Sequence, residues 1–108
     1  MATEDTGAVL EHHVQSLLAG DVEAVMEDYA DGALLISNIG IIASGRDEIR
    51  KVFESPPDLS GFEVTFQHVD GDIAYVTWRS TLFGFATDTF LVHNGRIEVQ
   101  TVAFVPVA

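Results

Sequence analysis

The sequence contains no cysteine. Disulfide bonds and thiolate metal sites are therefore both excluded. Lysine and arginine together number only 5 against 17 acidic residues, which gives a formal net charge of −12. This charge repels nucleic acid and anionic membrane surfaces, so we expect neither as a partner. We attribute the acidity to solubility or to a salt-tolerant host rather than to a specific cationic partner.

Long apolar runs are also missing. No stretch approaches the ~20 residues of a membrane-spanning helix, and the N-terminal segment MATEDTGAVLEHH lacks the basic and apolar regions of a signal peptide. We therefore expect a soluble, cytoplasmic protein. The chain has 108 residues, of which 47% are hydrophobic and 20% charged, and this composition predicts one packed domain over residues 1–108.

Helical periodicity marks the first half of the chain. Between Glu4 and Ala19 the apolar residues recur at spacings of three and four, which predicts an amphipathic helix. Asp21 is placed to cap a second helix over residues 22–29, whose inward stripe would end at Tyr29. A turn at residues 30–33 would follow this helix.

Glycine and proline then punctuate the chain. Residues 34–37 predict a short strand, and residues 38–45 predict a turn and a second short strand. Ser44 stands where it could cap a third helix over residues 46–55, which Pro56 and Pro57 would end.

From Phe62 onward the apolar period changes to two, which predicts strands over 62–69, 73–83, 86–93 and 96–105. Asn94 and Gly95 between the last two are the preferred residues of a type I′ hairpin, because both central positions need a positive φ. Helices first and a long antiparallel meander after them indicate an α+β fold.

The segment DTFLVHNGRIE contains the most informative residue of the chain. Alternation along a strand places Asp88 on the same face as Phe90 and Val92. If that face is buried, the carboxyl looks into an apolar interior, which raises its pKa and makes it a candidate functional group. The alternative is a structural carboxylate bonded to Arg79 or to backbone N–H groups. We keep both interpretations.

Three segments, AGDVEAVMEDYADGALL, GRDEIRKVFES and DTFLVHNGRIEVQTVAF, span roughly Val9 to Phe104. Together they resemble the NTF2-like superfamily, which includes ketosteroid isomerases, SnoaL-type polyketide cyclases and limonene epoxide hydrolases. The resemblance implies a cone-shaped α+β fold in which three N-terminal helices pack on a strongly curved antiparallel sheet that encloses an apolar pocket. It also implies a homodimer.

Comparison with the ketosteroid isomerases implies roles for three residues. Asp88 matches their pocket aspartate, which stays protonated and donates a hydrogen bond to an oxyanion. His13 stands where they have a phenol donor, and Ser37 stands where they have the carboxylate base. Since serine is a poor base, a complete steroid isomerase mechanism is not supported, but His13 is itself a candidate acid or base.

Comparison with the limonene epoxide hydrolases implies that Arg79 lies in the pocket. Thr81 and Val102 stand at the positions of their two aspartates, so that hydrolase chemistry is not supported. With Arg79 inside, alternation sends Trp78 to the outer face of the sheet, where an exposed indole is best explained by a homodimer interface.

The sequence therefore predicts two catalytic residues, Asp88 and His13, and a set of ligand contacts: Arg79, Gln100, Thr81, Ser37, Tyr29, Phe90, Val102 and Phe104. No cofactor is expected, and no metal site, because the four histidines are scattered without convergent carboxylates. One functional hypothesis is a proton-transfer enzyme of isomerase, cyclase or lyase type acting on a small hydrophobic carbonyl compound. The other is a module without turnover that binds a hydrophobic ligand or pairs with a protein through its sheet.

Overall fold

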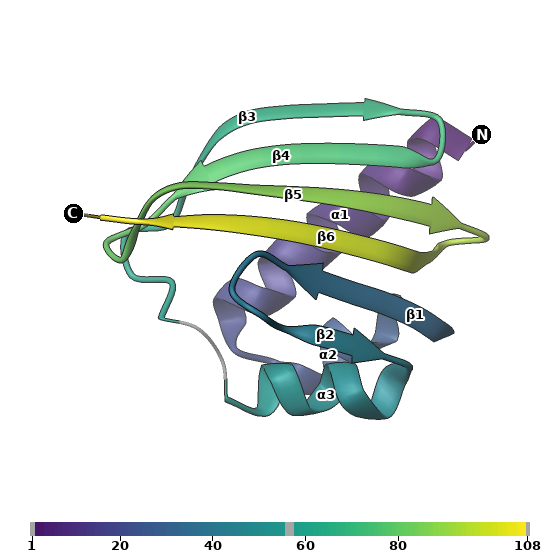
Figure 1. Ribbon diagram of the computed structural model, residues 1–108. Helices are drawn as coiled ribbons and strands as arrows, with labels where there is room; N and C mark the ends of the chain where they lie inside the picture. The colour runs from purple at the N-terminus through teal and green to yellow at the C-terminus, as the bar shows by residue number, and fades with distance from the viewer. Residues whose placement is uncertain (1, 56–57, 108) are drawn as a thin grey trace.

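The computed structural model describes residues 2–55 and 58–107. Helices and strands follow in the order α1 (Ala2–Ala19), α2 (Val22–Glu27), β1 (Tyr29–Ser37), β2 (Ile42–Ser44), α3 (Arg46–Glu54), β3 (Glu63–Asp70), β4 (Ile73–Arg79), β5 (Phe83–His93) and β6 (Arg96–Pro106). Figure 1 shows α1 crossing behind the long strands, whereas α2 and α3 lie together near β1 and β2. The α+β class is confirmed, although α3 follows β2 and the helices are not all N-terminal to the sheet.

The six strands form one sheet in the order β2-β1-β6-β5-β4-β3. The predicted meander of β3 to β6 is confirmed, and each of its neighbouring pairs is antiparallel. β1 pairs with β6 in parallel, so the expectation of a wholly antiparallel sheet is wrong at this pair. The register places Asp88 of β5 between Val76 of β4 and Val102 of β6, so these three side chains share one face of the sheet.

Two local predictions are confirmed in detail. Asp21 caps α2, and its side chain accepts a hydrogen bond of 3.1 Å from the backbone N–H of Ala24. Asn94 and Gly95 both have positive φ, 51° and 74°, between β5 and β6. These features depend only on neighbouring residues, which explains why the sequence signals them reliably.

Other boundaries differ from the prediction because long-range pairing decides them. Tyr29 and residues 30–33 belong to β1 rather than to a helix and a turn, since Tyr29 pairs with Ile97 of β6. The N-cap of α3 is Gly45, without a side-chain hydrogen bond, while the backbone N–H of Ser44 donates to Glu48 at 2.8 Å. α3 ends at Glu54. The proposed helix-ending Pro56 and Pro57 lie outside the described residues.

The core lies between the helices and the inner face of the sheet. The helices contribute buried apolar side chains that meet those of the strands. Trp78 belongs to this core and is only 6% exposed, so its predicted place on the outer face is wrong. Burying the indole beside Val76 removes apolar area from water, whereas the alternative would have buried the Arg79 guanidinium. Among the described helices, none is both long and apolar enough to cross a membrane.

Candidate functional site

A cavity of about 200 Å³ lies between α1, α3 and the inner face of the sheet. Its wall is mostly aliphatic and aromatic, and α1, α3, the β1–β2 turn, the segment before β3 and strands β1 and β4 to β6 all contribute to it. Leu18 and Ile39, which are 52% and 55% exposed, also belong to the lining and place its open side at the end of α1. Polar side chains are few in this wall: His13, Ser55, Asp88 and Gln100.

Asp88 is half-buried and lines the cavity with its carboxyl group. Oδ1 accepts a hydrogen bond of 3.2 Å from Trp78 Nε1, and Oδ2 accepts one of 3.1 Å from Gln100 Nε2. Burial raises the pKa of Asp88 to about 6, although the Trp78 donor, the charge of His13 and the Gln100 donor each lower it in part. The apolar environment therefore outweighs its two donors.

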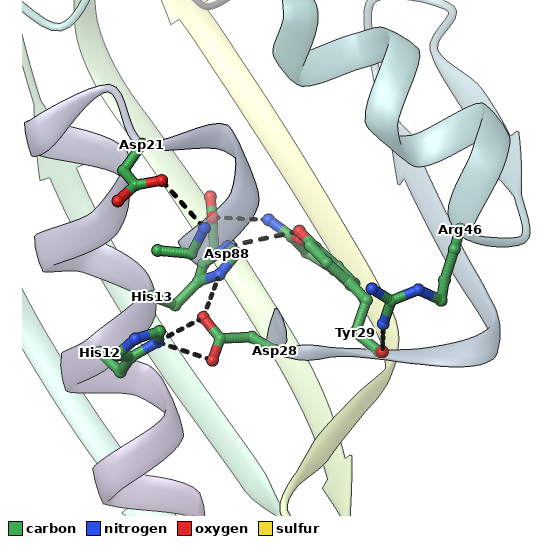
Figure 2. A network of polar contacts seen from close by, with 9 residues as sticks. His12, His13, Asp21, Asp28, Tyr29, Arg46 and Asp88 are labelled. Atoms are coloured by element: carbon green, nitrogen blue, oxygen red, sulfur yellow. Dashed lines mark hydrogen bonds and ion pairs between the residues drawn. The ribbon is translucent and has the colours of Figure 1, made fainter. Parts of the chain in front are cut away.

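A chain of hydrogen bonds links Asp88 to the two histidines of α1 (Figure 2). The Tyr29 hydroxyl donates to Gln100 Oε1 and lies 3.3 Å from His13 Nε2. His13 Nδ1 lies 3.1 Å from Asp28 Oδ2, and His12 Nδ1 lies 2.8 Å from Asp28 Oδ1. Burial, together with the charges of Asp88 and Asp28, raises the pKa of Tyr29 well above its usual range.

Local structure explains how these groups meet. His13 is fully buried on α1, and its ring makes edge contacts with Tyr29, Phe90 and Phe53 at centroid distances of 5.3, 5.5 and 6.3 Å. Asp28 is the C-cap residue of α2, directly before Tyr29 opens β1. The junction between α2 and β1 thus presents a carboxylate and a phenol to the same imidazole.

Six predicted site residues lie along the cavity wall: Asp88, His13, Gln100, Phe90, Val102 and Phe104. Tyr29 lies behind them and reaches the site through Gln100. The structure thus brings the predicted polar residues of α1, β1, β5 and β6 together. Asp88 has no ion pair with a lysine or arginine among the described residues.

Three predicted ligand contacts lie elsewhere. Arg79 is exposed and pairs with Glu63 at 2.6 Å, so its predicted place in the pocket is wrong, and the alternative in which it pairs with Asp88 is not what the structure shows. The exposed Thr81 lies in the turn after β4, where its N–H donates to the Ser60 carbonyl at 2.8 Å. Ser37 ends β1, and its Oγ accepts from the N–H groups of Ile39 and Ile41 at 3.2 and 3.1 Å. The Ser37 hydroxyl organises its turn because loop N–H groups need acceptors.

Sequence reasoning missed Trp78, Asp28 and His12. The sequence did contain a clue to Trp78. Val76 and Trp78 lie on the same face of β4 because they are two residues apart, and Val76 pairs with Asp88 across the β4–β5 hairpin, so all three side chains share one face. Asp28 and His12 carry no comparable signal. They lie 16 residues apart and meet only when α2 packs against α1.

The SnoaL-like domain family matches residues 10–106. The chain belongs to the SnoaL-like family. The predicted resemblance to NTF2-like proteins is confirmed by this match and by the solved structures that share the fold. A search of curated proteins gives no match.

Solved structures similar to this SnoaL-like protein include three that span most of both chains. An NTF2-like protein of unknown function from Burkholderia xenovorans LB400 has a TM-score of 0.85 and 23% identity, covering 100% of this chain and 88% of its own. A candidate ketosteroid isomerase from Kribbella flavida DSM 17836 has a TM-score of 0.86 and 19% identity, with coverages of 100% and 83%. A limonene-epoxide-hydrolase-like enzyme from M. tuberculosis has a TM-score of 0.75 and 16% identity, with coverages of 96% and 85%. These TM-scores show a shared fold.

Proposed function

We propose that this protein is a proton-transfer enzyme that acts on a small hydrophobic carbonyl compound, with Asp88 as the group that takes and returns the proton. The observation that carries the proposal is the Asp88 carboxyl, which faces an apolar cavity and has a pKa of about 6. A general base works best when its pKa lies near the working pH. At pH 7 roughly nine-tenths of Asp88 is ionised.

The chemistry needs only one carboxylate. Asp88 would remove a proton from the carbon beside the substrate carbonyl, and the electron pair of that C–H bond would form the enolate. The neutral carboxyl would then return the proton to the same carbon or to another one. An isomerisation results when the two carbons differ.

This assignment revises the role expected from the sequence. A protonated Asp88 that donates to an oxyanion would need a pKa above the working pH, and a pKa of about 6 favours the carboxylate at neutral pH instead. Both ring nitrogens of His13 contact groups of the protein, Asp28 and Tyr29. His13 is therefore assigned no direct proton transfer to the ligand. The similarity to a candidate ketosteroid isomerase supports the same class of chemistry.

The test is exchange of substrate protons for deuterium. A panel of small cyclic ketones and enones is incubated with the protein in D2O buffer, and loss of the α-proton signal is followed by proton NMR. We expect exchange above the buffer rate, abolished by Asp88→Asn and unchanged by Asp70→Asn, an exposed carboxylate at the end of β3. Ketones that bind in the cavity without any enhanced exchange would instead support the ligand-binding module.

We also propose a homodimer formed through the outer face of the sheet. The register sends large apolar side chains outward on β3, β4, β5 and β6, and four of them are at least 43% exposed: Phe66, Ile73, Phe85 and Val105. Between them lie four outward threonines on the central strands: Thr77, Thr87, Thr89 and Thr101. Two chains of charge −12 repel each other, so this apolar and threonine-rich part of the face, beside the mutually paired Arg79 and Glu63, is where a second copy can approach.

A further inference from the structure

The direction of each hydrogen bond between Asp88 and His13 follows from a count of the available protons. Gln100 donates through Nε2 to Asp88, so its Oε1 is the acceptor that faces Tyr29. The Tyr29 hydroxyl has one proton, and this proton points to Gln100. The phenol oxygen therefore offers only lone pairs to His13 Nε2, 3.3 Å away. That contact is a hydrogen bond only if Nε2 carries a proton.

The other ring nitrogen of His13, Nδ1, also carries a proton. Nδ1 faces Asp28 Oδ2 at 3.1 Å, and the same carboxylate also lies within 3.0 Å of His12 Nδ1. An ionised carboxylate only accepts hydrogen bonds, so both histidines donate to it. With Nε2 facing the lone pairs of Tyr29 and Nδ1 facing the carboxylate of Asp28, both ring nitrogens of His13 are donors.

We propose that His13 is an imidazolium in the resting protein, and that Tyr29 and Gln100 couple this positive charge to the carboxylate form of Asp88. Asp28 and Tyr29 hold the ring, and Gln100 presents its N–H rather than its oxygen to Asp88 because Tyr29 occupies that oxygen. His13 is thus a positioning residue for the proposed base. This inference deepens the proposed function, on which its catalytic meaning rests, but the coupling is a property of the free protein.

Reversing the direction of each hydrogen bond between His13 and Asp88 shows why the charge of His13 is linked to that of Asp88. If His13 loses its Nε2 proton, this nitrogen can only accept, and the Tyr29 hydroxyl must turn toward it. Gln100 must then donate to the Tyr29 oxygen, so its amide rotates and presents Oε1 to Asp88. A carbonyl oxygen facing a carboxylate is unfavourable, and the arrangement is satisfied only when Asp88 is protonated. A neutral His13 therefore favours a neutral Asp88.

The groups that face His13 from the surrounding elements are consistent with a buried cation. Asp28 lies at the end of α2, Tyr29 on β1 and Asp88 on β5, and the rings of Phe53 on α3 and Phe90 on β5 contact the imidazole edge-on. His12 meets Asp28 from the solvent side with a 45% exposed side chain. The Arg46 guanidinium donates to the Tyr29 carbonyl oxygen at 2.5 Å rather than to either carboxylate. One carboxylate, Asp28, thus contacts the imidazole, and a second, Asp88, is linked to it through Gln100 and Tyr29.

Nitrogen-15 NMR of the ligand-free protein, labelled in histidine, tests the proposal directly. At pH 7 we expect both ring nitrogens of His13 to be protonated in the wild type. In Asp88→Asn we expect Nε2 to be unprotonated at the same pH, because the new amide can donate to Gln100. A wild-type His13 with one bare nitrogen at pH 7, while Asp88 is ionised, would overturn the proposal.

A second measurement separates the hydrogen-bond link from simple attraction between charges. Carbon-13 titration of the Asp88 carboxyl is repeated in Tyr29→Phe, which keeps the ring and removes only the hydroxyl. We expect the pKa of Asp88 to rise from its value of about 6 by about one unit. Tyr75→Phe on β4 is the matched control and should leave it unchanged. Equal pKa values of Asp88 in the two variants would show that Tyr29 does not link His13 to Asp88. None of these measurements requires turnover, so failure of this inference can be told apart from failure of the proposed function.

Discussion

The indole of Trp78 donates a hydrogen bond of 3.2 Å to Oδ1 of Asp88, from the strand next to it in the sheet. The same indole packs against the rings of Phe62, Phe83 and Phe104 at centroid distances of 5.2 to 6.1 Å. The Trp78 side chain therefore both excludes water from the cavity wall and donates a hydrogen bond to the Asp88 carboxylate. These two effects act on the pKa of Asp88 in opposite directions, and burial is the larger one.

Replacing Trp78 with phenylalanine separates these two effects. Trp78→Phe keeps an aromatic ring in the wall and removes the Nε1 donor, so the pKa of Asp88 should rise further above about 6. Carbon-13 titration of the carboxyl measures this shift. Phe62→Leu, which alters the packing of the wall without removing a hydrogen bond, is the control. A pKa that falls or stays constant in Trp78→Phe would contradict the assigned donor.

The pH dependence of stability should reveal the cost of ionising Asp88. Its pKa is 3.8 in the unfolded reference and about 6 in the folded protein, so the folded state binds more protons between these values. Stability that is present below pH 4 is therefore lost as the pH rises through 6, by about 3 kcal/mol. In Asp88→Asn this loss is absent. Urea denaturation of both proteins at pH 4 and pH 7.5 measures the difference, and parallel changes in the two would count against the buried carboxyl.

Turnover of any ketone that passes the exchange assay should depend on ionised Asp88. We expect kcat/KM to rise with pH through a midpoint near 6, the pKa of Asp88 in the free protein. Asp88→Asn should lower kcat/KM by about 10² to 10⁴-fold, the usual contribution of a general base. A pH profile that is flat from 5 to 8 would show that another group limits the rate.

The proposed homodimer is tested on the outer face of the sheet. Phe85→Asp places a charge among the exposed apolar side chains of β5, where two negatively charged copies would meet, and should shift the protein toward monomer. Leu82→Asp, in the turn after β4, is the matched control and should not. Sedimentation velocity measures both. If Phe85→Asp sediments as the wild type does, the interface lies elsewhere or does not exist.

Because Trp78 is buried, a substitution at this position tests the core and the cavity rather than a subunit interface. The sequence suggested an exposed indole at a subunit interface, but a residue that is 6% exposed and bonded to Asp88 acts on the cavity. Loss of the dimer in a Trp78→Ala variant would therefore reflect damage to the core. The outward Phe85 is the sharper probe.

The sequence by itself determined the features that neighbouring residues encode. The cap at Asp21, the turn at Asn94 and Gly95, and the alternation that groups Asp88 with Phe90 all depend on contacts within a few residues. The cavity-facing side of β6, with Gln100 and Phe104, followed from the family resemblance and is where the structure has it. Local backbone preferences and a period of two are readable without the fold.

Only the tertiary structure decided which face of β4 is buried and which distant groups meet. Alternation gave two equivalent choices for that strand, and the packing of Trp78 against the inner face settled it, leaving Arg79 in water with Glu63. Tyr29 entered a strand because β6 pairs with it, and Asp28 reached His13 because α2 packs on α1. Such contacts join residues far apart along the chain, and their energies exist only once the helices and the sheet have come together.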